Sequence, residues 1–122
     1  MFDFKKPVDT DGLASWGSPE DVGCRTIEGK PELFGDVRLG SFDAPVMAGL
    51  YKATKGKFEI PYPFHEHVCV LEGEVALTDE SGETRVFGPG DSWIVRKGDT
   101  VIWDVRSDFV MKSFFVATVD AG

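Results

Sequence analysis

The sequence predicts an all-β domain, folded as a sandwich or barrel. From about residue 36 onward, short apolar runs alternate with turns rich in Gly, Pro and Asp, a pattern typical of short strands. No segment carries a long apolar repeat with a period of 3.6 residues, which an amphipathic helix would show. The 122 residues correspond to one domain of ordinary size. Many short strands in one such domain favour a sandwich or a barrel.

The expected strands follow one another in order. They cover residues 46–54, 58–60, 68–71, 75–78, 84–87, 93–95, 100–105 and 109–119. The segments 75–78 and 84–87 are expected to pair as a hairpin, because the loop between them has Gly82 near its tip. Strong turns at 88–91 and 97–99 separate the later strands. Closure of the sheet would remove its edges and leave an interior that side chains or a ligand can fill.

Residues 1–30 differ in composition from the rest of the chain. Turn-forming residues dominate this segment, and its apolar periodicity is weak. We expect residues 1–30 to form an extended N-terminal arm and residues 31–122 to form the barrel domain. Trp16 is the expected anchor of the arm, which either packs over its own domain or reaches a partner subunit.

Charge and hydropathy exclude several classes of partner. The formal net charge is −8 and the sequence pI is about 4.6, so nucleic acid and anionic membranes would be repelled. No stretch approaches the roughly 20 apolar residues that span a bilayer, and the first residues lack the apolar core of a signal peptide. We expect a cytoplasmic protein that binds neither nucleic acid nor membrane. Two cysteines, Cys24 and Cys69, are too few for a disulfide framework and are expected to be free thiols.

Two segments resemble the sequence motifs of the cupin superfamily. The first begins at Gly56-Lys57-Phe58, includes Glu66 and ends at Leu71-Glu72-Gly73-Glu74-Val75, and the second covers residues 88–98. The resemblance implies a double-stranded antiparallel β-barrel, the cupin jelly roll, which is often dimeric. Barrels of this size often cover an outer sheet face with a second copy, so we expect a homodimer.

Among cupins, the sequence most resembles the family named after (S)-ureidoglycine aminohydrolase, DUF861, which includes ethanolamine-utilisation-like small cupins. The similar features are Gly49-Leu50-Tyr51, Glu66, the turn at 71–73, Trp103 five residues after Gly98, and Lys112 in the last strand. The resemblance extends from about Trp16 onward. It implies a small polar metabolite, such as an amine or ureide, as ligand and aminohydrolase-like chemistry as one possible activity.

Many cupins bind a transition metal through two histidines and a glutamate in the first motif and one histidine in the second. Counting back from Gly73 places the glutamate of that set at Glu66. The same count places the two histidine positions near Ile60 and Tyr62, and the last ligand position at Val101. Only one of the four ligand positions therefore carries a metal-binding side chain, and we predict no firm cofactor.

The two histidines of the chain, His65 and His67, flank Glu66. Side chains alternate between the two faces of a strand, so an inward Glu66 places both histidines on the outer face. A bulge between residues 61 and 66 would instead rotate one histidine inward. In that case Glu66 with His65 or His67 would bind a divalent ion such as Zn, Mn or Ni weakly.

Glu66 and Lys112 are the candidate catalytic residues. A carboxylate inside a small barrel has a raised pKa unless a cation pairs with it, and such a group can act as a general acid or base. Lys112 interrupts an otherwise apolar strand, so it must reach solvent or find a partner, and Glu66 is the expected partner. A structural carboxylate and a surface lysine are the alternative interpretations.

Four aromatic residues are candidate ligand-binding residues: Tyr51, Tyr62, Trp93 and Trp103. Tyrosine hydroxyls can offer hydrogen bonds inside an apolar pocket, and the family resemblance suggests Trp103 as a wall of that pocket. Each of the four can equally be part of the core.

Three functions remain open at this point. The chain is an enzyme that acts on a small metabolite through Glu66 with Lys112 or a weakly held metal. Alternatively, it is a non-catalytic binding module that has lost its metal site, or a structural dimerisation domain with a filled interior. The candidate carboxylate favours the first, the missing histidines favour the second, and the abundance of aromatic residues favours the third.

Overall fold

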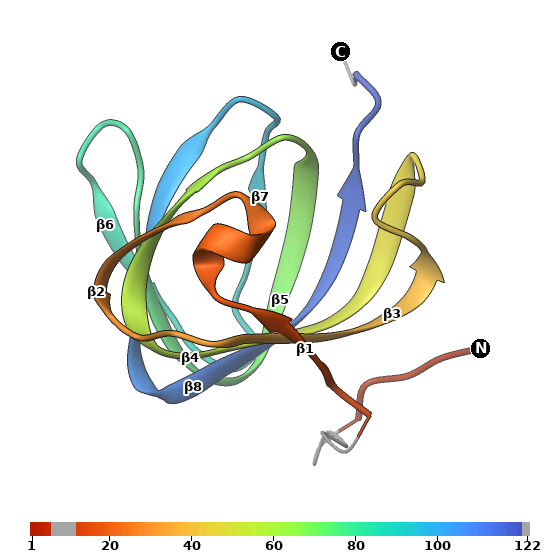
Figure 1. Cartoon of the computed structure of the whole chain (residues 1–122), viewed down its shortest axis with the longest axis horizontal. Helices are drawn as coiled ribbons and strands as arrows, with labels where there is room; N and C mark the ends of the chain where they lie inside the picture. The colour runs from red at the N-terminus through yellow and green to blue at the C-terminus, as the bar shows by residue number, and fades with distance from the viewer. Residues whose placement is uncertain (6–11, 121–122) are drawn as a thin grey trace.

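The computed structural model describes residues 1–5 and 12–120 of the chain, and strands make up most of them (Figure 1). In chain order the elements are β1 (Ala14–Gly17), the single-turn 3₁₀ helix η1 (Pro19–Val22), β2 (Arg25–Gly29), β3 (Leu33–Gly40), β4 (Val46–Pro61), β5 (His65–Thr78), β6 (Thr84–Phe87), β7 (Ser92–Val95) and β8 (Thr100–Ala117). Every strand pairing is antiparallel. Within the described ranges, no helix is long and apolar enough to cross a membrane.

Three strands are longer than the sequence predicts, because each continues through a bulge. β4 joins the expected segments 46–54 and 58–60, and its register with β8 shifts between Thr54 and Gly56. β8 likewise joins 100–105 and 109–119 up to residue 117. β5 has two register shifts against β8, between residues 70 and 75. Bulges bend a strand and increase its twist, so each of these strands can serve two layers.

The two halves of the long strands lie in two facing layers. In the first layer, residues 46–54 of β4 lie between β3 and the last part of β8. The last part of β8 also pairs with the first part of β5, and β5 pairs with β7 on its other side. In the second layer, residues 56–61 of β4 lie between β2 and residues 100–105 of β8. Residues 100–105 of β8 also pair with the end of β5, and the end of β5 pairs with β6. The result is an antiparallel jelly-roll sandwich.

The hydrogen-bonded sheet is curled but not closed. Its main path runs β1-β3-β4-β8-β5-β6 and ends in two edges, with β2 and β7 paired off this path. The closed sheet expected from the sequence is therefore wrong for the described residues, because the bent strands form an open sandwich whose sheet keeps two edges.

Gly73 shows why the bend in β5 needs a glycine. Its φ is +83°, in the left-handed region that residues with a Cβ rarely adopt. A Cβ at this position would also collide with the backbone carbonyl of Phe109 on β8. The Leu71-Glu72-Gly73 turn of the sequence motif is thus a close approach of two bent strands.

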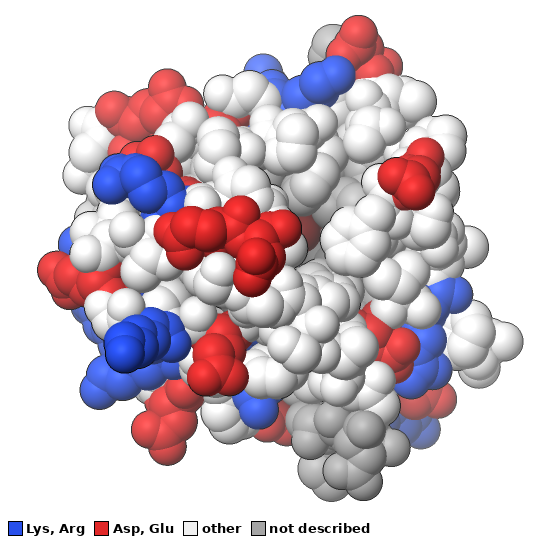
Figure 2. All heavy atoms as spheres, in the orientation of Figure 1, with Lys and Arg blue, Asp and Glu red and all other residues white. Residues whose placement is uncertain are grey.

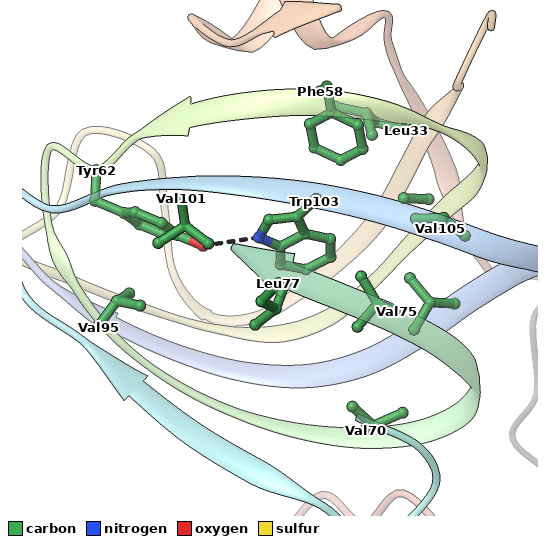
Figure 3. Close-up of a cluster of buried hydrophobic side chains, with 12 residues drawn as sticks. Leu33, Phe58, Tyr62, Val70, Val75, Leu77, Val95, Val101, Trp103 and Val105 are labelled. Atoms are coloured by element: carbon green, nitrogen blue, oxygen red, sulfur yellow. Dashed lines mark hydrogen bonds between the residues drawn. The ribbon is translucent and has the colours of Figure 1, made fainter. Parts of the chain in front are cut away.

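The end of the interior next to these bends is filled with apolar side chains (Figure 3). Trp103, at the border of this region, has no exposed surface and stacks on Phe58, with the ring centroids 5.7 Å apart. Completely buried neighbours complete the packing: Leu33, Ala53, Val70, Val75 and Val110. Burial of this apolar surface is the main favourable contribution to folding.

The N-terminal arm is part of the sheet. β1 pairs with β3, and β2 pairs with β4. The ring of Trp16 lies where a side chain of Gly35 would otherwise be, and it contacts Tyr51 and Phe42 with centroid distances of 6.0 and 5.1 Å. Residues 6–11 of the predicted arm lie outside the described residues. In the described part, the arm packs over its own domain with Trp16 as the anchor.

Candidate functional site

A cavity of about 840 Å³ occupies the other end of the interior, where the long strands begin and end. β4, β5 and β8 supply its inner wall, the arm supplies a second wall, and the segments 41–44 and 61–64 border the opening. The face presented in Figure 2 is hollowed near its centre, and uncharged residues surround most of the hollow. A cavity of this size suits a small metabolite.

One ion pair lies in this mostly apolar wall. Lys112 Nζ donates a hydrogen bond to Glu66 Oε2 at 2.8 Å, and both side chains are 5% exposed. The two residues are on neighbouring strands but are not opposite one another, because Glu66 pairs with Val116 and Lys112 pairs with Val70. The lysine side chain therefore extends along the inner face to reach the carboxylate.

The ammonium group of Lys112 is surrounded by aromatic rings. Its Nζ lies 4.5 Å from the ring centroid of Tyr51, 4.8 Å from Trp103 and 5.8 Å from Phe114. Aromatic faces attract a cation through their negative electrostatic potential. Burial nevertheless lowers the pKa of Lys112, although the charge of Glu66 and the hydrogen bond to it act in the opposite direction.

The ion pair retains hydrogen-bonding capacity toward the cavity. A lysine ammonium has three donors, and one of them bonds Glu66 Oε2. Glu66 Oε1 accepts no hydrogen bond from any residue in the part of the chain that the structure describes. A donor and an acceptor that face the same cavity can bind a ligand with the complementary pair of groups.

Tyr51 and Tyr62 line the cavity, whereas Trp103 supports the wall from behind. The indole N–H of Trp103 donates to the Tyr62 hydroxyl at 3.0 Å (Figure 3). This bond fixes the orientation of Tyr62 and leaves its O–H free to donate. Burial raises the pKa of both tyrosines well above the ordinary value, so both hydroxyls are protonated at neutral pH.

The fourth aromatic candidate, Trp93, does not reach this cavity. Its ring packs on Phe87 and Trp103, with centroid distances of 4.7 and 5.8 Å. It borders a separate, smaller cavity between the β6 hairpin and β7, whose lining includes neither Glu66 nor Lys112. The structure thus brings two of the four aromatic candidates to the cavity surface.

The arm contributes cavity residues that the sequence did not single out as site residues. Cys24 and Trp16 lie in the wall, and residues 21–23 lie at its margin. Burial raises the pKa of the Cys24 thiol to about 11, so this group is a neutral thiol at neutral pH. Only the long-range pairing of β2 with β4 brings it here, and no local sequence signal indicates that pairing.

The two histidines flanking Glu66 do not contribute to the cavity wall. His65 Nδ1 accepts a hydrogen bond from the backbone N–H of Lys97 at 3.0 Å. Its Nε2 is buried without a hydrogen-bond partner among the described residues. His67 is exposed on the outer face, beside Ile94 of β7 and Phe115 of β8.

The residues at the cupin ligand positions do not fit a transition-metal ion. Glu66 is already paired with the ammonium of Lys112, which takes the place of a cation beside the carboxylate. Ile60 and Val101 have no donor atoms, and the Tyr62 hydroxyl accepts the hydrogen bond from Trp103. The described residues contain no group of three metal-binding side chains. We therefore derive no chemistry through a metal at this site.

Comparisons with known proteins agree with this architecture. A family model described as the EutQ-like cupin domain matches residues 40–114. A solved structure of a DUF861-family protein of unknown function, from Pseudomonas syringae pv. tomato str. DC3000, superposes with a TM-score of 0.74 at 22% identity, covering 86% of this chain and 44% of that chain. The EutQ protein of Clostridium difficile gives a TM-score of 0.62 at 14% identity, covering 74% and 65% of the two chains.

A DUF861-family protein from Thermotoga maritima is similar over a shorter region, with 28% identity and a TM-score of 0.51, covering 55% of this chain and 75% of that chain. The chain spans less than two thirds of the length of the Pseudomonas and Clostridium proteins. The search among curated proteins finds no match.

Proposed function

Because the chain belongs to the EutQ-like cupin family, we propose that its barrel interior binds one small metabolite with an apolar body and a polar end. The observation that supports this most strongly is the ion pair between Glu66 and Lys112 in the wall of an otherwise apolar cavity of about 840 Å³. Burying two charges is costly, and a filled hydrophobic core would not need them.

The charge balance of the wall favours a ligand with no net charge. The carboxylate of Glu66 and the ammonium of Lys112 neutralise one another. Asp21 lies at the margin and is exposed, so solvent screens its charge. A charged ligand would move from water into an apolar site that offers no opposite charge to pair with it, which is unfavourable.

The donor and acceptor left over on the ion pair favour an amide or ureide end group. A carbonyl oxygen would accept from Lys112 Nζ, and the neighbouring N–H would donate to Glu66 Oε1. In hydrolysis of such a C–N bond, Glu66 would take a proton from the attacking water and return it to the leaving nitrogen as the bond breaks, with Lys112 stabilising the oxyanion. This proposal assigns the catalytic roles to Glu66 and Lys112, and ligand contacts to Tyr51 and Tyr62.

The test measures the binding of benzamide and of a panel of small amides and ureides to the full chain. The change in tryptophan fluorescence and the shift of the thermal unfolding temperature report the binding. Val22 is 41% exposed and borders the cavity, so Val22→Trp should narrow the opening and weaken binding about tenfold or more. Val86 is 52% exposed on β6, away from the cavity, and Val86→Trp is the matched control. Equal binding by the two variants, or no binding of any panel member to the natural chain, contradicts the proposal.

A second proposal concerns the outer face of the first layer. Phe115, His67 and Ile94 lie side by side across β8, β5 and β7, and Phe115 and Ile94 are 46% and 72% exposed. We propose that a second copy of the chain covers this apolar row, because cyclic dimers commonly form through such self-complementary patches.

Light scattering tests the dimer directly. The natural chain should have twice the mass of one chain at micromolar concentration, and Ile94→Lys should shift it toward the monomer. Val86→Lys places the same charge on another exposed strand position and should leave the dimer intact. A monomeric natural chain would contradict this proposal without affecting the cavity.

A further inference from the structure

We propose that Lys112 forms a covalent imine with an aldehyde or ketone bound in the cavity, and that Glu66 carries the protons for this reaction. The inference rests on the proposed function, since the carbonyl compound must first enter the cavity. It assigns to the site a carbonyl ligand class and a chemical step that are different from hydrolysis.

Three requirements for imine formation meet in this wall. The first is a primary amine that faces a cavity, and Lys112 meets it. The second is a group that takes and returns protons within hydrogen-bond distance of the amine, and Glu66 Oε2 lies 2.8 Å away. The third is an apolar environment that favours the neutral amine, which is how enzymes that form Schiff bases activate lysine. The lowered pKa of Lys112 is in the same direction.

The first half of the reaction forms the carbon–nitrogen bond. The ammonium of Lys112 transfers one proton to Glu66, and the resulting amine lone pair attacks the carbonyl carbon while the carbon–oxygen π bond breaks. The oxygen then takes the proton from Glu66, which produces a carbinolamine with a protonated nitrogen. No proton has entered or left the cavity at this stage.

The second half expels water. Glu66 removes a proton from the carbinolamine nitrogen and delivers it to the hydroxyl group, which leaves as water while the nitrogen lone pair forms the C=N bond. The product is a protonated imine on Lys112 beside an ionised Glu66. In total, one ammonium and one carbonyl become one iminium and one water, so no oxidant or other reactant is needed.

The surroundings of Lys112 suit this product as well as they suit the free lysine. The iminium keeps the single positive charge of the ammonium, next to the same carboxylate. It also stays near the rings of Tyr51 and Trp103, whose centroids lie 4.5 and 4.8 Å from Nζ. The reaction therefore creates no unpaired charge in the cavity, which would otherwise oppose it.

The experiment treats the full chain with limiting benzaldehyde and sodium cyanoborohydride, followed by peptide mass mapping of every lysine. We expect a benzyl adduct on Lys112 that forms at least about tenfold faster than on any exposed lysine, because Glu66 lies 2.8 Å from Lys112 Nζ and can take its proton before the amine attacks. The exposed Lys55 and the half-buried Lys52 and Lys57 on β4 are internal references outside the cavity wall. Labelling of Lys112 no faster than of these residues would overturn the proposal.

Substitutions at Glu66 and at Val22 separate the chemistry from binding. Glu66→Gln should slow the adduct on Lys112 by about tenfold or more, and Glu66→Asp should restore part of the rate, while labelling of the β4 lysines stays unchanged. Should Glu66→Gln fail to fold, Val22→Trp provides the second measurement, because it should slow labelling of Lys112 alone. If neither Glu66→Gln nor Val22→Trp changes the rate at which Lys112 is labelled, the proposal is overturned.

Benzamide distinguishes this proposal from the proposed function. It has the same apolar body as benzaldehyde but does not form an imine under these conditions. If benzamide binds and slows the labelling of Lys112, both proposals are supported. If benzamide binds but benzaldehyde gives no selective adduct, imine formation is refuted and the binding function stands. If neither compound binds, both fail.

Discussion

The two ends of the interior are built from the same three long strands, but one end is solid and the other is hollow. Next to the bends of β4, β5 and β8, the side chains are short or flat and fill the space, as with Val70, Val75 and Phe58. Toward the ends of the strands, the inner face carries Glu66, Lys112 and a smaller apolar group, and a cavity remains. Trp103 lies between the two regions and contacts both.

The difference shows how one small domain divides stability from function. Tight packing at the bent end supplies apolar burial that does not depend on a ligand. The open end places two buried charges where they contribute little to stability by themselves. Shortening a side chain should therefore cost more stability at the first end than at the second, and only substitutions at the second should change what the cavity binds.

The largest expected effect comes from truncating matched phenylalanines at the two ends. Phe58→Ala should lower the free energy of unfolding by about 4 kcal/mol, because it creates a new void in a packed core. Phe114 is 6% exposed and already borders the cavity, so Phe114→Ala should cost about half as much. Chemical denaturation measures both, and equal losses would show that the two ends are not energetically distinct.

The next effect tests the ion pair. Lys112→Met should lower the free energy of unfolding by about 3 kcal/mol, because it leaves the Glu66 carboxylate buried without a partner. The double variant Glu66→Gln/Lys112→Met replaces both charges with neutral groups of similar volume and should regain most of that loss. A double variant as unstable as the single one would mean that the pair itself stabilises the fold.

The smallest effect is a loss of stability in alkali, contributed by the open end. The folded-state pKa of Cys24 is raised to about 11, so its stabilising contribution is complete below the pKa of an unfolded thiol, about 8.5, and is lost as the pH rises toward 11. The raised pKa values of Tyr51 and Tyr62 act in the same direction above about pH 10. The lowered pKa of Lys112 has the opposite effect, because a lysine that loses its proton more readily in the folded state makes the stability rise with pH.

Thermal unfolding as a function of pH measures this effect. The midpoint temperature of unfolding of the natural chain should fall as the pH rises above about 8.5. For Cys24→Ser this temperature should fall less steeply, because serine does not ionise in this range. Both proteins should unfold at similar temperatures at neutral pH. An identical alkaline fall in both would show that Cys24 does not contribute.

Local patterns were enough to predict the fold class, and the motif resemblance was needed for the inner face of β5. The resemblance placed Glu66 inward, alternation along the strand then placed His65 outward, and the structure has the same arrangement. An isolated lysine in an apolar strand indicated that Lys112 needed a partner, and its contact with Glu66 is present. These predictions depend on the pattern within each strand and on the motif that contains Glu66.

The rest of the site depends on contacts between segments far apart in the sequence. Nothing local indicates that Cys24 lies in the cavity wall, because β2 reaches it only through pairing with β4. Nor does the sequence distinguish Trp93 from Trp103, since both lie in short apolar strands and only the packing of the two layers separates them. The bends were missed for a related reason, because a bulge looks like a turn between two shorter strands.

The described part of the arm, which supplies Trp16 and Cys24, borders the cavity without carrying any of the three bends. Within the arm, Glu20 joins η1 to β2 by accepting hydrogen bonds from the N–H and hydroxyl of Thr26, at 2.6 and 2.7 Å. Changes between residues 16 and 24 can therefore reshape the binding volume while the bent strands stay as they are. Evolution or engineering can therefore alter the ligand selectivity of this chain through substitutions in one short segment, while the ability of the chain to fold is largely preserved.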